Sequence, residues 1–268
     1  MLKKLNPFLN VTASNTATVN LANLLGTSIN RIILALGGGS FTKSHITGVR
    51  IKANSKTIFD DTGSRIDDRM EYRGIASAAG YLTIDFAEIR AKTIVGQLAG
   101  VLDTTFGIKQ LTMEVDIGAA TTPTLSGYAD IGEPQTGSQY QPFIAKVLNF
   151  SQSFAAAGKF PVDIGWGRRT GTIFKRLHFF GTTITAVEVK KNGIAIFEDL
   201  PDALNDFMQG EYGRSPQSNL YTVDFMPAGN ISDALLVDPN LPMEYYATLS
   251  GAGTVTTVAE LLDTLDNN

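Results

Sequence analysis

The stretch ITGVRIKANSKTIFDD, residues 46–61, is repeated later in the chain as ITAVEVKKNGIAIFED, residues 184–199. Eight of the 16 aligned positions are identical, and the exchanges Ile51/Val189 and Asp60/Glu198 are conservative. A recurrence of this length within one chain indicates a duplicated structural unit. We therefore expect two tandem copies of one domain.

Further matches extend the repeat in both directions. Residues 81–86, YLTIDF, align with residues 220–225, LYTVDF, and residues 26–31, GTSINR, align with residues 171–176, GTIFKR. The offset is 138 between residues 46–61 and 184–199, 139 between residues 81–86 and 220–225, and 145 between residues 26–31 and 171–176. Loops of different length in two copies of one fold would produce this drift.

The repeat divides the 268-residue chain into three segments. We expect the first copy at residues 1–135, a linker rich in Gly, Pro, Gln and Ser at 136–144, and the second copy at 145–268. A chain of this size is also close to the length at which single cores begin to split.

Both copies show the patterns of short β-strands. Asn192-Gly193 lies between two apolar runs and is a strong hairpin signal, and Asn54-Ser55 occupies the equivalent place in the first copy. RIILAL, residues 31–36, and IFKRLHFF, residues 173–180, are candidate core strands. Roughly eight short strands in each copy predict an all-β fold of two tandem jelly-roll β-sandwiches, a double jelly roll, with a few short helices in loops.

Helical patterns are few. RIDDRMEY (65–72) and PDALNDFMQG (201–210) occupy equivalent places, with Asp68 and Met70 aligned to Asp206 and Met208 at offset 138. We also expect helices in AKTIVGQLAGVL (91–102) and in VAELLDTLD (258–266).

The composition excludes several classes of site. The chain has no cysteine and two histidines, so disulfides, thiolate metal sites, cysteine nucleophiles and multi-histidine metal sites are ruled out. The net charge of −4 argues against direct binding of nucleic acid. Charged residues make up 18%, which suggests that much of the subunit surface is covered by other molecules. We expect a soluble protein made in the cytoplasm, because the chain shows neither a secretory signal nor an apolar run of spanning length.

GGGSFTKS, residues 37–44, is similar to a phosphate-binding P-loop, with Gly37, Lys43 and Ser44 in register. However, Thr42 replaces the second glycine, and a hairpin rather than a long helix follows. The pattern favours a glycine-rich turn between two strands.

Other residues with chemical potential have ordinary structural interpretations. Asp85 and Asp224 are equivalent positions of the repeat, so the duplication explains them, and we expect exposed or turn-pairing aspartates. His45 and His178 lack partners for a triad or a metal site, which favours packing roles. Trp166, near Arg168-Arg169, is interpreted as a loop anchor or a subunit contact. We therefore predict no catalytic and no cofactor-binding residues.

Two acidic pairs are the candidate metal ligands. Asp60-Asp61 and Glu198-Asp199 lie at the ends of the predicted hairpins, where calcium sometimes binds and where solvated strand ends are the default. Residues 198–268 contain 12 Asp and Glu against one Arg. This acidic region could pair with basic regions of a neighbouring subunit, hold divalent cations between subunits, or form a solvated face.

Three stretches of the second copy carry a family resemblance: ITAVEVKKNG (184–193), FMQGEYG (207–213) and LYTVDFMPAGNISDALLVD (220–238). They resemble the double jelly-roll major capsid proteins of tailless icosahedral viruses, in particular those of the corticovirus type, the small membrane-containing marine phages. TIVGQLAGVLDTTFGIKQLTMEVDI (93–117) in the first copy is also similar. These are framework residues, so they indicate fold and assembly role rather than a site.

The resemblance implies a structural subunit of a virion and no enzyme. In that family, two jelly rolls stand perpendicular to the capsid surface, and three chains form a pseudo-hexameric trimer that tiles an icosahedral shell over an internal membrane. Calcium is associated with stability of the corticovirus capsid, so we expect no required cofactor but Ca²⁺ as a candidate structural ion.

The expected partners follow from the same resemblance: a homotrimer, neighbouring capsomers, penton or spike proteins and membrane-associated virion proteins. The N-terminal MLKKLNPFLN is a candidate for a peripheral membrane contact. The expected location is the virion capsid, assembled in the host cytoplasm. The alternatives are a non-viral double β-sandwich that binds carbohydrate, and a two-domain cupin enzyme, which the two distant histidines fit poorly.

Overall fold

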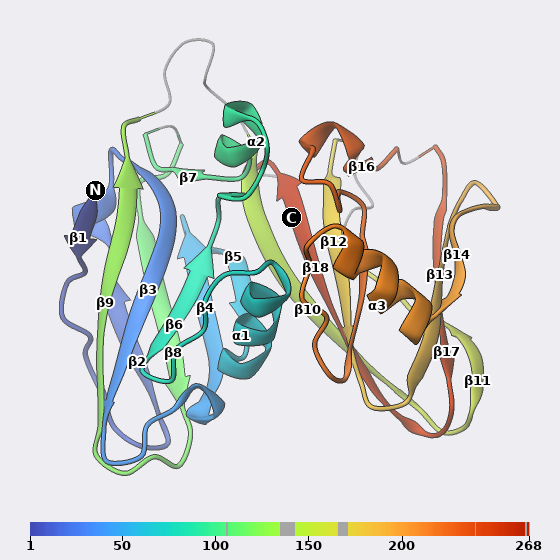
Figure 1. Ribbon diagram of the computed structural model, residues 1–268. Helices are drawn as coiled ribbons and strands as arrows, with labels where there is room; N and C mark the ends of the chain where they lie inside the picture. Colours follow the sequence, from blue (N-terminus) through green and yellow to red (C-terminus); the bar gives the residue numbers. More distant parts are fainter. Residues whose placement is uncertain (106, 135–142, 166–170, 239, 266, 268) are drawn as a thin grey trace.

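Two sandwiches of β-strands lie side by side in this protein (Figure 1). The computed structural model describes residues 1–268 except 106, 135–142, 166–170, 239, 266 and 268. We call the sandwich of β1–β9 the first roll and the sandwich of β10–β18 the second roll. The strands of the first roll are β1 (Leu2–Lys4), β2 (Asn15–Asn20), β3 (Ser28–Gly38), β4 (Ile46–Ala53), β5 (Lys56–Asp61), β6 (Tyr81–Asp85), β7 (Leu102–Asp103), β8 (Leu111–Ile117) and β9 (Pro123–Gly132).

The second roll contains nine strands among the described residues. They are β10 (Ile144–Phe154), β11 (Gly158–Pro161), β12 (Ile173–Phe180), β13 (Ile184–Lys191), β14 (Ile194–Pro201), β15 (Leu220–Asp224), β16 (Leu235–Leu236), β17 (Met243–Leu249) and β18 (Gly253–Asp263). The helices are α1 (Gly63–Tyr72), α2 (Ile94–Leu98) and α3 (Asp202–Glu211), with short 3-10 turns η1 (Ala22–Leu24), η2 (Lys43–His45) and η4 (Ile231–Asp233).

The two rolls have the same topology. The first roll pairs its strands in the orders β1-β9-β3-β6 and β2-β8-β4-β5, and β7 pairs with β3. The second roll has the orders β10-β18-β12-β15 and β11-β17-β13-β14, and β16 pairs with β12. Every strand of the second roll therefore corresponds to the strand nine numbers earlier. The predicted duplication and double jelly-roll fold are confirmed.

The two hairpins that open the repeat have the predicted turns. Asn54 and Ser55 have φ values of 48° and 68°, and Asn192 and Gly193 have φ values of 52° and 75°. Positive φ at both central residues is what a two-residue hairpin turn requires, and Asn and Gly tolerate it best. The predicted linker 136–144 lies outside the described residues up to position 142, and its last residue, Ile144, is the first residue of β10.

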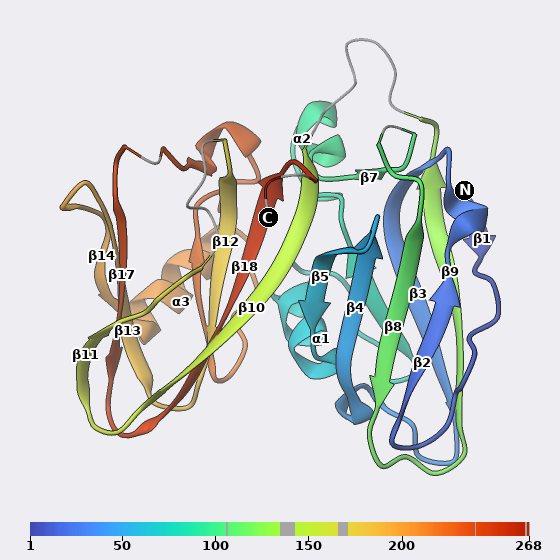
Figure 2. The same ribbon diagram turned by 180° about the vertical axis from the view of Figure 1, so that it is seen from behind.

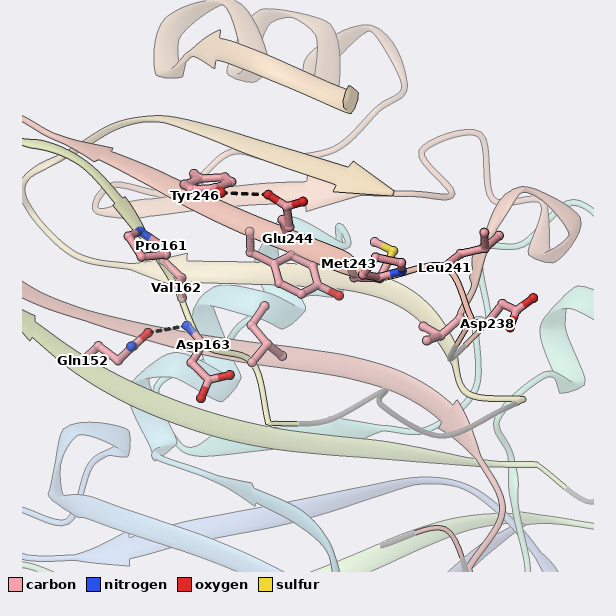
Figure 3. Close-up of a pocket in the computed structure, with 13 residues that line it drawn as sticks. Gln152, Pro161, Val162, Asp163, Asp238, Leu241, Met243, Glu244 and Tyr246 are labelled. Carbon is pink, nitrogen blue, oxygen red and sulfur yellow. Dashed lines mark hydrogen bonds between the residues drawn. The ribbon is translucent and has the colours of Figure 1, made fainter. Parts of the chain in front are cut away.

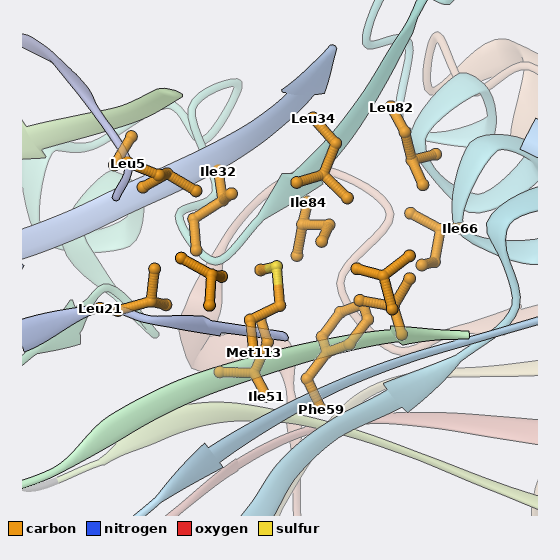
Figure 4. Close-up of a cluster of buried hydrophobic side chains, with 14 of the residues drawn as sticks. Leu5, Leu21, Ile32, Leu34, Ile51, Phe59, Ile66, Leu82, Ile84 and Met113 are labelled. Carbon is orange, nitrogen blue, oxygen red and sulfur yellow. The ribbon is translucent and has the colours of Figure 1, made fainter. Parts of the chain in front are cut away.

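A parallel bridge joins the rolls into one continuous sheet. β5 pairs with β10 at Phe59 and Val147, which links the inner sheets of both rolls into nine strands. The largest hydrophobic cluster crosses the same boundary, because Val147 and Val258 of the second roll belong to the cluster that fills the first roll. Figure 4 shows this cluster, with Phe59 close to Met113 and Ile51.

The helix predictions had mixed outcomes. The helices expected at 65–72 and 201–210 are α1 and α3, and the one expected at 91–102 is reduced to α2. The helix expected at 258–266 was wrong, because residues up to Asp263 belong to β18. β18 pairs with both β10 and β12 and is buried on both faces, so its apolar run lacks the alternation that marks a strand.

Among the described residues, none of the helices has both the length and the apolar character needed to cross a lipid bilayer. The longest helices, α1 and α3, have ten residues each, against the roughly 20 that a span requires.

Replacing Phe59 by Ala is expected to lower the free energy of unfolding by about 3–5 kcal/mol, because the side chain is buried in the cluster that joins the rolls and packs edge-on against Phe86. Urea unfolding at one fixed protein concentration measures this loss. The control Ile94→Ala removes a side chain that is 74% exposed and should change the value by less than about 0.5 kcal/mol. Equal losses in both variants would contradict a shared core at Phe59.

Candidate functional site

The most unusual chemistry of the molecule is buried between the two rolls. Helix α1 of the first roll lies against the second roll, beside β12 and β18 (Figures 1 and 2). The helix begins at Thr62, whose side-chain hydroxyl accepts a hydrogen bond from the backbone N–H of Arg65. This cap places one face of α1 on the boundary between the rolls.

Arg176 of β12 is the centre of this boundary. The side chain is completely buried and donates hydrogen bonds to three carboxylates. Its Nε lies 3.0 Å from Asp224, and its Nη1 lies 2.9 Å from Glu88 and 3.0 Å from Glu260. Because Glu88 belongs to the first roll and the other two to the second roll, one guanidinium group joins both halves of the chain.

Helix α1 adds two side chains to the same network. Arg69 donates from Nη1 to Glu260 at 2.6 Å and from Nε to Asp61 at 3.1 Å. The Tyr72 hydroxyl lies 2.8 Å from Gln209 of α3 and 3.3 Å from Asp224 of β15. Burial and the Asp224 carboxylate raise the pKa of Tyr72 well above its usual value, so the hydroxyl keeps its proton.

Several ion pairs of the boundary join one roll to the other. Arg69 of the first roll pairs with Glu260 of the second roll, and Glu88 of the first roll pairs with Lys175 and Arg176 of the second roll. The remaining charges of the boundary are paired within one roll: Asp61 with Arg65 and Arg69, Arg73 with Asp85 and Glu88, and Asp224 with Arg176 and Arg214. Removing two charges from water is costly unless they are paired and hydrogen-bonded, so separating the rolls would leave the pairs between them broken.

The pKa of Glu88 shows whether burial or the nearby positive charges dominate in this network. Burial by itself acts to raise the pKa of this carboxyl group, but the guanidinium groups of Arg176 and Arg73 outweigh burial and hold it well below its usual range. Glu88 is therefore ionised, and Lys175 donates a further bond to it at 2.7 Å. The opposite holds for Asp85, where burial outweighs Arg73 and raises the pKa to about 6.

Asp85 and Asp224 are not exposed, which was one of the two interpretations that the sequence favoured. Asp224 does make the turn contact of the other interpretation, because its Oδ1 accepts a hydrogen bond from the backbone N–H of Met226 at 2.9 Å. Both are buried ion-pair residues: Asp85 accepts from Arg73 at 2.9 Å, and Asp224 accepts from Arg176 at 3.0 Å. Exposure was the wrong expectation because a polar residue at a strand end looks exposed when its ion-pair partner lies on another element, 12 residues away for Asp85 and 48 residues away for Asp224. A signal was nevertheless present, since Lys175-Arg176 interrupts an apolar strand.

The two histidines occupy structural positions. His45 accepts a hydrogen bond at Nδ1 from the backbone N–H of Thr42 and so caps η2. His178 is completely buried, with Nδ1 2.9 Å from the Thr222 hydroxyl and its ring edge-on to Tyr72. Burial lowers the pKa of His178, and the nearby Glu260 carboxylate offsets only part of this effect.

The glycine-rich segment 37–44 is a turn between β3 and β4, as expected. Gly38 has a φ of 100°, and a Cβ there would collide with the backbone oxygen of Thr122. The amino group of Lys43 donates hydrogen bonds to both carboxylate oxygens of Asp67 at 2.7 Å, so its positive charge is paired within the protein.

The structure does not bring the four candidate metal ligands together. Asp61 accepts hydrogen bonds from two arginines in the buried boundary, whereas Asp60 beside it is half-buried. Glu198 is exposed on β14, and Asp199 lies 3.3 Å from Lys159. Across the residues that the structure describes, no three acidic or histidine side chains are grouped as a metal site would require. Trp166, Arg168 and Arg169 lie outside the described residues.

A surface groove of about 530 Å³ lies beside β11 and β17 of the second roll (Figure 3). Its lining includes the carboxylates of Asp163, Asp238 and Glu244, and the Tyr246 hydroxyl donates to Glu244 at 2.8 Å. A carbohydrate site usually offers an open aromatic ring. In this groove, the ring of Tyr245 is buried. The Nζ atoms of Lys159 and Lys190 lie 5.8 Å and 5.3 Å from the centroid of the Tyr246 ring.

Comparison with solved structures places the chain in the class of double jelly-roll viral capsid folds. The crystal structure of the major capsid protein P2 from bacteriophage PM2 superposes with a TM-score of 0.88 over 100% of this chain and 98% of that chain, at 22% identity. The atomic structure of Sulfolobus Turreted Icosahedral Virus gives a TM-score of 0.70 over 100% of this chain and 91% of that chain, at 16% identity.

Sequence comparison then gives the family. Residues 2–132 match the viral coat protein P2 N-terminal domain, and residues 144–265 match the viral coat protein P2 C-terminal domain. The chain therefore belongs to the viral coat protein P2 family. It is also 26% identical over 243 residues to the major capsid protein P2 of Pseudoalteromonas phage PM2, which covers 87% of this chain and 86% of that protein. This protein is thus a structural component of a virion capsid and no enzyme, which decides against the carbohydrate-binding and cupin alternatives.

Replacing Arg176 by Met is expected to lower the free energy of unfolding by about 3–5 kcal/mol, because three buried carboxylates lose their shared partner. The matched control is Arg31→Met. Arg31 occupies the equivalent strand position in the first roll, is half-exposed, and lies 3.4 Å from Asp130, so its loss should cost less than about 1 kcal/mol. Urea unfolding measures both, and a larger loss in the Arg31 variant would contradict the central role of the buried network.

His178 should make the stability of the protein sensitive to mild acid. Its pKa is lowered in the folded state below the ordinary 6.5, so the unfolded chain binds the proton more readily, and stability is lost as pH falls below about 6.5. The variant His178→Asn keeps an amide near Thr222 but cannot titrate. From pH 7 to 5, the wild type should lose stability relative to this variant by up to about 1.4 kcal/mol per pH unit. Parallel pH profiles of the unfolding free energy in the two proteins would contradict this role of His178.

Proposed function

We propose that this capsid protein assembles as a homotrimer of pseudo-hexagonal outline, which tiles the facets of an icosahedral shell over an internal membrane. The duplication supports the proposal, because three chains with two equivalent rolls each supply six similar units around one axis. A six-unit ring packs on a flat facet as a hexagon does, while the two copies remain free to diverge in sequence.

The observation that carries the proposal is an uncovered apolar surface at the end of the second roll. The side chains of Ile194 and Ile196 on β14, of Leu204, Phe207 and Met208 on α3, and of Tyr212 just after it are exposed, and that of Phe207 is 65% accessible. Contiguous apolar side chains on the surface of a protein mark interaction sites. In the first roll, the equivalent helix α1 is buried against the second roll, so α3 lacks the covering that its counterpart has within the chain.

We also propose that Ca²⁺ ions are bound between subunits. Asp61 is occupied by arginines, whereas Glu198 and the neighbouring acidic residues of β14 and α3 face outward. A Ca²⁺ ion needs six to eight oxygen ligands, which two copies could supply jointly. Further proposed partners are adjoining capsomers, a penton or spike protein and membrane-associated virion proteins. We also propose a peripheral membrane contact of the N-terminal segment and no direct contact with nucleic acid.

The native mass of the purified protein tests the trimer. Light scattering on a sizing column is expected to give 86.4 kDa, three times the 28.8 kDa chain, with larger assemblies favoured by Ca²⁺ and reversed by chelator. Negative-stain images of the trimer should show a pseudo-hexagonal outline. A 28.8 kDa monomer with and without Ca²⁺ would overturn the proposal.

A further inference from the structure

The contact between the two rolls of one chain indicates which surfaces of two chains could meet. There, β5 and α1 of the first roll meet the sheet β10-β18-β12-β15 of the second roll. The corresponding elements at the two ends of the molecule are β14 with α3 and the sheet β1-β9-β3-β6. Figures 1 and 2 show that these two groups lie on opposite ends of the molecule, so neither covers the other.

The sheet β1-β9-β3-β6 of the first roll and the sheet β10-β18-β12-β15 of the second roll are equivalent residue by residue. In the second roll, Arg176 of β12 pairs with Asp224 of β15 and with Glu260 of β18 in the strand register. In the first roll, Arg31 of β3 pairs in the same way with Asp85 of β6 and Asp130 of β9. The same pattern of one arginine between two carboxylates therefore occupies the same place on both sheets.

These equivalent faces differ in what covers them. Arg176, His178 and Val258 of the second roll are completely buried by the first roll. Their register partners in the first roll are Arg31, Ile33 and Tyr128, which lie on the outer face of β3 and β9 and are half-exposed or exposed. We call this surface, with Leu2 and Lys4 of β1 and Tyr81 of β6, the first-roll face.

Helix α3 presents to solvent the positions through which α1 makes its contacts. Ile66 and Met70 are buried in α1, and Asn205 and Gln209 are buried in α3, so the helices correspond at an offset of 139. This is one residue more than the offset that the sequence suggested, because β14 contains an additional bulge residue where it pairs with β13.

At this offset, two arginines of α1 that contact the second roll have apolar counterparts in α3. The buried Arg69 corresponds to Met208, and Arg65, which lies over the Phe180 ring of the second roll, corresponds to Leu204. Met208 and Leu204 are 41% and 45% exposed. A methionine can adapt to a partner surface without the desolvation cost of a charge.

The strand bridge of the boundary also has a counterpart between chains. Val147 of β10 is opposite Glu260, and Leu2 of β1 is opposite the equivalent Asp130, so Leu2 takes the place of Val147. Val147 pairs in parallel with Phe59, whose equivalent in the repeat is Phe197. Leu2 is 66% exposed, and the β14 edge is free of any strand on its outer side among the described residues.

We infer that the β14–α3 edge of one copy docks on the first-roll face of a second copy, with a parallel bridge between Phe197 and the second copy's Leu2. This inference rests on the proposed function, because it assigns the surfaces that close the trimer. Next to the bridge inside the chain, the Asn149 side chain donates to the backbone oxygen of Asp60 at 2.8 Å. In the repeat, Lys4 corresponds to Asn149 and Glu198 corresponds to Asp60. The inferred contact between two copies therefore places Lys4 of one copy beside Glu198 of the other.

Charge supports this arrangement. The β14–α3 edge carries Glu198, Asp199, Asp202, Asp206 and Glu211, whereas β1 and β3 of the first-roll face carry Lys4 and Arg31. Asp130 on that face already pairs with Arg31 and with the amino terminus. Opposite charge across an interface steers association and fixes its register.

Cysteine cross-linking tests which surfaces meet. The chain has no cysteine, so every thiol product is assigned. A mixture of Lys4→Cys and Glu198→Cys chains, treated with a short thiol-reactive cross-linker, should give linked dimers, and each variant alone should not. The double variant K4C/E198C should give a ladder that ends at three chains, because the contact closes a ring. The control pair Ile94→Cys and Glu198→Cys, which places the first thiol on α2, should not cross-link.

Charge reversal gives an independent readout. Lys4→Glu and Glu198→Lys should each raise the concentration at which half of the chains are trimeric, by about fivefold for a surface pair, and the double swap K4E/E198K should restore the wild-type value. Met208→Asp should weaken the trimer more strongly, whereas the control Ile94→Asp should leave it unchanged. Circular dichroism confirms that each variant is folded.

The outcomes separate the two proposals. A trimer by mass that neither cross-links through positions 4 and 198 nor responds to charge reversal would overturn this inference and leave the proposed function standing. A folded protein that stays monomeric at all concentrations would overturn both. Cross-linking together with rescue by the double swap would establish the contact.

Discussion

The structure depends on the burial of Arg176 between the two sandwiches. One guanidinium group is bonded to carboxylates of both rolls, and α1 closes the site with Arg69 and Tyr72. The stabilisation that such a network contributes over an apolar interface is small or negative, because desolvation offsets most of the Coulomb attraction. Its effect is on geometry: any sliding or rotation of one roll against the other would leave buried charges without partners, so a single arrangement is strongly preferred.

That single arrangement matters for a capsid subunit. In the proposed trimer, a ring of six similar units closes only if the angle between neighbouring units is well defined. In this chain, the angle between the two rolls is set by the buried network, the Phe59–Val147 bridge and the shared apolar cluster. The proposed contact between chains differs from the contact within the chain, because α3 presents Leu204 and Met208 where α1 presents Arg65 and Arg69. The two copies therefore share a topology, whereas the proposed contact between chains combines these apolar side chains with the opposite charges of Glu198 and Lys4.

Many of the charged residues are not on the surface. Five carboxylates and five cations lie in the boundary between the rolls, so the surface carries even fewer charges than the composition suggests. The remaining acidic residues are concentrated on β14 and α3, at the end of the molecule opposite to Lys4 and Arg31. This separation of charge was visible in the chain from residue 198 onward, but its meaning depends on which ends face each other.

The sequence by itself determined the duplication, the double jelly roll, the two hairpin turns and the helices α1 and α3, because repeats, turn residues and periodicity are local properties of the chain. It misassigned residues 258–263 as helix, since a strand buried on both faces loses its alternation. It also did not show that Asp85 and Asp224 are buried in ion pairs, since such a pair depends on a partner that another element supplies. Only the tertiary structure decided which sheet is covered within the chain and which remains open. That choice follows from the side-by-side packing of the rolls: it buries Arg176 and leaves its counterpart Arg31 half-exposed, although both lie in the same strand register.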